Sequence, residues 1–204
     1  MKSNKVWTKE KIENYLIKLL VDNCHEILQL EYNSTKLTKS ESPDFIVDDC
    51  ENIIGVEITR AMDKNVQWVN DIRGKCFENI AVSQTAYEDK NLTTKEINNI
   101  LNKSKDKIIG KPYKGYKLEE KVTNDIISAI SKKIKKFDSY KKFNKNILLV
   151  HSEMRASLDI NIVIERLVKY TLNTDIVFDL IFLKLSNKLY YFTKQINGNC
   201  KIKT

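Results

Sequence analysis

Apolar residues recur with helical spacing in several stretches of the chain. Residues 8–27 carry one apolar stripe, and Thr8 before it is an acceptable N-cap. Residues 118–138 carry a second, very regular stripe, and a third is expected at about 159–172. Residues 64–110 have an irregular helical pattern with polar breaks. These patterns predict amphipathic helices that each cover one side of another element.

Between the helical stretches, shorter segments have the composition of strands. Some alternate apolar and polar residues, and residues 147–150 are fully apolar, as in a strand covered on both faces. Residues 33–42 are predicted as a polar loop. The predicted strands are residues 27–32, 45–47, 53–59, 147–150, 178–183 and 188–193, of which the last two form a C-terminal hairpin. The order of elements predicts an α/β fold, with three layers around a central mixed β-sheet.

Composition excludes several classes of protein. The chain has 204 residues, 42% of them apolar and 30% charged, which suits a single globular domain. No apolar run approaches the roughly 18–20 residues that span a bilayer, so we expect no membrane association. The N-terminus leads into a charged helical pattern rather than an apolar signal core, which predicts a cytoplasmic protein. The four cysteines have no zinc-site spacing, and we expect reduced thiols.

The net charge of +8 is unevenly distributed along the chain. Residues 1–60 hold 8 basic and 11 acidic side chains, whereas residues 101–146 hold 14 lysines and 5 acidic side chains. An acidic cluster beside a basic flank suits a site that holds a divalent metal next to a polyphosphate partner. A lysine-rich, solvated surface is the alternative interpretation of the same charges.

The candidate chemistry lies in the predicted hairpin. Asp44 opens one strand, and Glu57 in the next strand shares a face with Thr59, because strand side chains alternate. Two carboxylates on adjacent strands can converge within a few ångströms. Such a pair binds a hard, oxygen-seeking cation such as Mg²⁺ or Mn²⁺, with waters and a phosphate oxygen completing the coordination shell.

These residues resemble the motif of a known family. An opening helix, Pro43-Asp44 at a strand start and Glu57-Ile58-Thr59 in an apolar strand about 13 residues later resemble the PD-(D/E)xK nuclease superfamily, which has the restriction-endonuclease-like fold. The resemblance covers roughly residues 8–60 by motif and 118–151 by element order. It implies one restriction-endonuclease-like domain over residues 1–204, with residues 64–117 as a helical insertion.

The resemblance also implies a function and a set of ligands. The expected activity is metal-dependent hydrolysis of phosphodiester bonds in a nucleic acid, DNA in preference to RNA. Asp44, Glu57 and the Ile58 carbonyl would hold Mg²⁺ or Mn²⁺. The first helix of this superfamily often contributes a further acid, and Glu13, which borders the apolar stripe, is the candidate. A solvated charge at the edge of the helix is the alternative for Glu13.

One position departs from the family pattern. Thr59 stands where the family usually has a lysine, and some members resemble this chain and supply the lysine from a following helix. At about 100° per residue, Lys133 lies at about 20° from Val122, inside the apolar stripe of residues 118–138. A lysine on a buried face normally needs an acidic partner, and Asp44 and Glu57 would supply one. Alternatively, Lys133 extends from the stripe edge to solvent.

Three functions therefore remain open from the sequence. The first is a metal-dependent nuclease with Asp44, Glu57, Lys133 and Glu13 as catalytic residues and with the basic region along the phosphate backbone. The second is a non-catalytic nucleic-acid-binding module that keeps the nuclease-like fold. The third is an α/β protein-interaction module whose carboxylates are surface charges. The sequence is compatible with a homodimer and does not fix the oligomeric state.

Overall fold

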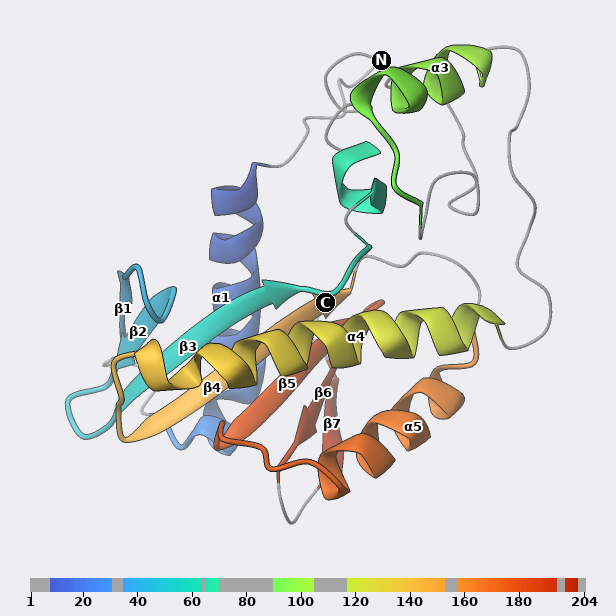
Figure 1. Ribbon diagram of the computed structural model, residues 1–204. Coiled ribbons are helices and arrows are strands. Elements are labelled where there is room, and N and C mark those ends of the chain that lie inside the picture. The colour runs from blue at the N-terminus through green and yellow to red at the C-terminus, as the bar shows by residue number, and fades with distance from the viewer. Residues whose placement is uncertain are drawn as a thin grey trace.

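A computed structural model describes residues 8–30, 35–63, 65–69, 90–104, 117–152 and 158–193, and the backbone of residues 197–201 (Figure 1). A short helical segment at residues 65–69 and a 3₁₀ turn, Phe137–Ser139, accompany the main elements. The helices are α1 (Lys9–Leu28), α3 (Thr94–Lys103), α4 (Lys117–Lys136) and α5 (Ile160–Leu172). The strands are β1 (Lys36–Lys39), β2 (Phe45–Asp48), β3 (Ile53–Arg60), β4 (Lys145–Ser152), β5 (Leu180–Leu185), β6 (Lys188–Phe192) and β7 (Asn197–Lys201).

The strands form one mixed sheet in which neighbours follow the order of the sequence. Strands β1 to β6 make up most of it, and β7 adds a further strand beside β6. The central strands β3, β4 and β5 are parallel, and the other neighbours pair antiparallel. Because parallel connections are right-handed and both crossovers step in the same direction, helix α4 of the first crossover and helix α5 of the second lie on one face of the sheet. The α/β class, the mixed sheet and the hairpin of β5 and β6 are confirmed.

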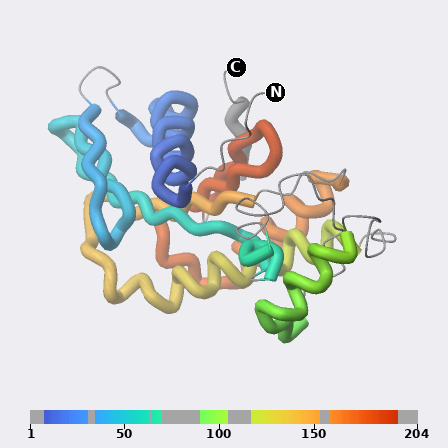
Figure 2. Tube along the Cα trace, turned by 90° about the horizontal axis from the view of Figure 1, so that it is seen from above, coloured from blue at the N-terminus to red at the C-terminus, as the bar shows by residue number. Residues whose placement is uncertain are grey.

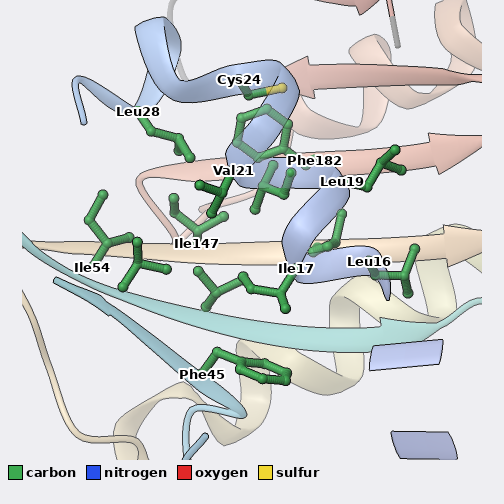
Figure 3. Packing of buried hydrophobic residues seen from close by; sticks show 14 of the residues in the cluster. Leu16, Ile17, Leu19, Val21, Cys24, Leu28, Phe45, Ile54, Ile147 and Phe182 are labelled. Carbon is green, nitrogen blue, oxygen red and sulfur yellow. The ribbon is translucent and has the colours of Figure 1, made fainter. Parts of the chain in front are cut away.

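The two faces of the sheet are covered by different helices. Helix α1 packs its stripe, including Leu16 and Ile17, against Phe45, Ile147 and Phe182 on one face (Figure 3). Helices α4 and α5 cover the opposite face, as the view from above shows for α1 and α4 (Figure 2). Alternation along β3 therefore directs Val56 and Ile58 toward α1 and leaves Glu57 on the face of α4.

A separate, smaller core lies beyond the carboxyl end of β3. Helix α3 begins at a capping box in which Thr93 and Glu96 bind each other's backbone N–H groups. Its apolar side chains pack with those of the helical segment at residues 65–69. The two segments lie next to each other beyond β3 (Figure 1). The fully buried members of this cluster are Val66, Val69, Ile97 and Leu101. These residues belong to the stretch 64–117, of which residues 64, 70–89 and 105–116 lie outside the described part of the chain.

The predicted strand at residues 27–32 is wrong. Its first two residues complete α1, which ends where Gln29 takes a left-handed conformation with φ 59° and donates its N–H to Glu26 O. The first strand is instead β1, inside the stretch that was predicted as a polar loop, and it pairs with β2. An edge strand such as Lys36–Lys39 is largely exposed and rich in lysine, so it has the composition of a loop.

Candidate functional site

Asp44 lies where the pairing of β2 with β3 ends. The β2–β3 ladder ends at the pair of Phe45, the first residue of β2, with Val56. Beyond this pair, the Ile58 N–H donates a hydrogen bond to Asp44 Oδ2 at 2.7 Å. The carboxylate thus replaces a main-chain acceptor at the end of the ladder. Because a strand residue directs its own N–H and C=O to the same side, the Ile58 carbonyl faces the side on which Asp44 lies.

The backbone next to Asp44 is packed closely against the loop that follows α4. A Cβ atom at Gly55 would lie 2.6 Å from Phe143 Cδ2 and 3.0 Å from Pro43 Cγ. Glycine at this position therefore allows Phe143 and Pro43 to cover β3 directly. This close approach fixes the start of β2, and with it the position of the Asp44 carboxylate.

Glu57 is buried between β3 and α4, with 5% of its surface exposed. Its Oε1 atom accepts hydrogen bonds from Lys133 Nζ and from Tyr140 Oη, the latter at 3.3 Å. Its Oε2 atom is buried and has no hydrogen-bond partner among the residues that the structure describes. A buried carboxylate oxygen left in this way is costly, which is a reason to consider a ligand at that atom.

Lys133 reaches Glu57 because of its place on α4. The helix buries Val122, Ile126 and Ile130 against the sheet, and Lys133 lies along the edge of that stripe with 22% of its side chain exposed. The amine points to Glu57 and does not extend to solvent. The structure therefore brings together Asp44 from the bend before β2, Glu57 from β3 and Lys133 from α4, and their catalytic roles remain predictions.

The electrostatics of Asp44 reflect these neighbours. Burial raises the pKa of the Asp44 carboxyl above its ordinary value, and the charge of Glu57 raises it further. The hydrogen bond from Ile58 and the charges of Lys133 and Lys9 oppose this shift without cancelling it. At neutral pH, an ionised Asp44 therefore costs folding free energy, and this cost would be relieved by a cation between the two carboxylates.

Glu13 is buried and not a solvated edge charge. It lies on α1 with 8% of its surface exposed, and its carboxylate pairs with Lys9 at 3.3 Å. Lys9 is close enough to Asp44 to lower the pKa of that carboxyl, so Glu13 connects to the site through Lys9. Within the described residues, no group of three or more histidine, cysteine, aspartate and glutamate side chains could hold a metal ion. The catalytic role of Glu13 stays a prediction.

The donor set fits one kind of metal. Mg²⁺ in proteins is usually bound by one or two carboxylates, with waters and substrate phosphates filling its other positions. Asp44, Glu57 and the Ile58 carbonyl offer such a partial set of hard oxygen ligands. The buried Glu57 Oε2 atom is the observation that favours a ligand here. The set offers no soft ligand, so it favours Mg²⁺ or Mn²⁺ over zinc.

Tyr140 is a residue of this site that the sequence did not single out. Burial, followed by the charge of Glu57, raises its pKa, so its hydroxyl remains a hydrogen-bond donor at neutral pH. Its ring packs edge-to-face on Phe137, with 6.3 Å between the centroids. Tyr140 lies just after the 3₁₀ turn that follows α4, where helical spacing no longer predicts direction. The sequence shows an aromatic residue at this position, but it does not predict the contact with Glu57.

His151 on β4 is a partly buried histidine beside the carboxyl end of β3, and its pKa depends on the packing there. Its neighbours in register are Arg60 on β3 and Lys184 on β5. Burial, followed by the charges of Lys184 and Arg60, lowers the pKa of His151 from 6.5 to about 4. Between these values the unfolded chain binds a proton that the folded protein excludes, so stability falls as the pH falls through this window.

We expect this histidine to remove roughly 2–3 kcal/mol of folding free energy between pH 7 and pH 4. Urea unfolding of the wild type and of His151→Gln at several pH values measures the effect. The glutamine variant should lose less stability than the wild type over this range, because it lacks the titrating group. Equal losses in both proteins would contradict the low pKa of His151.

Comparisons with protein-family models, with curated proteins and with solved structures find no match for this chain. None of the helices in the described part of the chain is long and apolar enough to cross a membrane. The interpretation of the site therefore depends on its own residues and on the sequence motif that they form.

Proposed function

We propose that this protein is a divalent-metal-dependent nuclease of the PD-(D/E)xK superfamily, with a restriction-endonuclease-like core and the helical insertion at residues 64–117. The observation that carries the proposal is that Asp44, Glu57 and Lys133 lie near one another, with the Oε2 atom of Glu57 buried and without a hydrogen-bond partner among the described residues. Two acids and a lysine from a strand hairpin and a helix match the chemistry of the motif, although Thr59 replaces the motif lysine.

Each side chain has a role in phosphodiester hydrolysis, in which water attacks phosphorus and the bond to one ester oxygen breaks. Asp44, Glu57 and the Ile58 carbonyl would hold Mg²⁺ or Mn²⁺. When bound, the metal lowers the pKa of water and neutralises charge that develops on the phosphate. Lys133 would replace the motif lysine, and its ammonium would orient the attacking water and stabilise negative charge. Tyr140 holds Glu57 in place through its hydroxyl.

The surface around Lys133 suits a polyanionic substrate. Exposed lysines follow the last turns of α4 and the loop after it, close to the site. They are Lys132, Lys135, Lys136, Lys141 and Lys142. The acidic pair would repel a phosphate backbone, whereas these lysines attract it and release its counterions. DNA is the substrate that we propose, with RNA as a second substrate to be assayed.

A cleavage assay tests the proposal directly. The full chain should cut a DNA oligonucleotide in the presence of Mg²⁺ or Mn²⁺ and should be inactive in EDTA. Glu57→Gln should abolish cleavage but retain DNA binding, with an affinity that falls by a log–log slope of about −0.9 per phosphate contact as salt rises. An RNA oligonucleotide assayed in parallel identifies the preferred substrate.

Two outcomes would overturn the nuclease proposal. DNA binding with the expected salt dependence, but without cleavage by either metal, would favour a non-catalytic nucleic-acid-binding module. The observation that favours this alternative is that Lys133 already neutralises Glu57, beside a position where Thr59 replaces the motif lysine. The absence of DNA binding would favour a protein-interaction module.

A further inference from the structure

A hollow of about 540 Å³ opens beside the candidate site. Glu57 contacts Lys133 near the end of α4, whereas Asp63 pairs with Lys121 near its start, at 3.7 Å. The helix therefore runs antiparallel to β3, and the hollow occupies the space between them. Thr59, two residues after Glu57 on the same face of β3, lines its wall. The hollow thus begins where the candidate site ends.

The charged groups of the wall favour an anionic ligand. Four cationic side chains line the hollow, against two acidic ones. Asp63 accepts hydrogen bonds from the backbone N–H groups of Asn65 and Val66, at 2.8 and 3.3 Å. Asp125 pairs with Lys121 at 3.3 Å. Lys121 pairs with both acids, and the four cationic and two acidic side chains together leave the wall a net charge of +2. This net positive charge favours an anionic ligand.

The other wall residues are suited to a nucleobase and its sugar. Asn91 carries an amide group and Ser128 a hydroxyl, which are groups that read the edges of bases, whereas the Asn65 amide nitrogen already donates to the Lys90 carbonyl. Met62 adds an apolar side chain for contact with a ring. Pockets for small molecules enclose about 300–1,000 Å³, so the hollow has the size for a nucleoside monophosphate.

We propose that this hollow binds one nucleotide of the substrate strand, next to the phosphodiester bond that the acidic pair addresses. The proposal rests on the proposed nuclease function and adds to it a subsite for the neighbouring nucleotide. Two residues along β3, from Glu57 to Thr59, cover about 7 Å, a length that one nucleotide unit spans. Lys132, which borders the hollow on α4, provides a cation for the phosphate.

Binding of a mononucleotide to the full chain tests this subsite. Deoxyadenosine 5′-monophosphate is titrated by calorimetry in EDTA, so that neither metal binding nor cleavage contributes. We expect it to bind at least about tenfold more tightly than inorganic phosphate, because the base and sugar add contacts. Ser128→Tyr places an aromatic ring in the hollow from an exposed position on α4, and should weaken binding by about tenfold or more.

Asn124→Tyr is the matched control, because Asn124 is exposed on the same helix and does not line the hollow. It should bind the mononucleotide as the wild type does, and circular dichroism checks that both variants fold. Equal affinities for the mononucleotide and phosphate, or equal affinities of the two variants, would overturn the subsite. Nucleotide binding blocked by Ser128→Tyr in a chain that cleaves nothing would retain the subsite and overturn the nuclease. DNA cleavage by a protein whose mononucleotide binding is not weakened by Ser128→Tyr would retain the nuclease and overturn the subsite.

Discussion

Replacing Lys133 with methionine is expected to slow DNA cleavage by about 10²–10³-fold, the usual effect of losing one preorganised electrostatic group. Methionine keeps most of the aliphatic stem that packs along α4, but it removes the ammonium that contacts Glu57. DNA affinity should change little, because Lys133 is one of many lysines. Mn²⁺ affinity should not fall, because the cation that competes for Glu57 is lost. A large loss of rate with both affinities retained would assign Lys133 to catalysis.

The control for this variant is Lys135→Met. Lys135 is exposed on the last turn of α4, whereas Lys132 borders the hollow and is therefore unsuitable as a neutral control. Both variants lose one positive charge from the same helix, so they share any effect on long-range attraction of DNA. Equal cleavage rates for Lys133→Met and Lys135→Met would show that the position of Lys133 beside Glu57 has no role in the reaction.

The sequence predicted the side chains whose direction follows from the regular period of one helix or one strand. The 3.6-residue period of α4 placed Lys133 inside the apolar stripe, and a buried ammonium needs an acid. The alternation of β3 placed Glu57 opposite in direction to Val56 and Ile58, which pack under α1. Each inference needed only local geometry and the class of fold, and the structure has these side chains on the faces that were expected.

The features that the sequence did not predict depend on irregular backbone or on polar edge strands. Tyr140 lies 83 residues from Glu57, and its direction depends on the 3₁₀ turn after α4. Lys9 affects Asp44 only because α1 crosses the sheet near the start of β2. The edge strands β1 and β7 have few apolar residues, so no hydrophobic pattern marks them. The contact of Tyr140, the effect of Lys9 and the pairing of the edge strands all depend on long-range packing. Local patterns in a single sequence do not predict such packing.

The candidate site contains buried charged groups that lower the folding stability of the protein. Asp44 has a raised pKa because of burial and the nearby charge of Glu57, and Glu57 keeps a buried oxygen without a hydrogen bond in the described structure. Most buried polar groups in proteins have a hydrogen-bond partner, so an unpaired buried carboxylate oxygen with a second acid nearby is unusual. Groups held at a cost in stability cluster at functional sites, where the ligand or the reaction compensates. For Asp44, this reasoning gives opposite expectations for metal binding and for stability when the carboxylate is neutralised.

Asp44→Asn is expected to abolish Mn²⁺ binding and to raise thermal stability at neutral pH. The amide oxygen still accepts the Ile58 N–H, while the charge opposed by burial and by Glu57 is removed. A raised pKa in the folded state means that wild-type stability is greatest in acid and is lost as pH rises through that pKa. The stabilisation should therefore appear at neutral pH and vanish below the ordinary value of 3.8.

Glu57→Gln should also abolish Mn²⁺ binding, but it should lower stability, because it leaves the Lys133 ammonium without its partner. Asp48→Asn is the control, since Asp48 lies at the other end of β2 and accepts the Cys50 N–H in the turn. Calorimetric titration with Mn²⁺ measures the first effect, and melting curves at pH 7 and about pH 3 measure the second. Unchanged Mn²⁺ affinity in Asp44→Asn and Glu57→Gln would exclude the metal site. Loss of Mn²⁺ binding in both, with opposite shifts in melting temperature, would identify Asp44 as a carboxylate that the fold retains for its ligand.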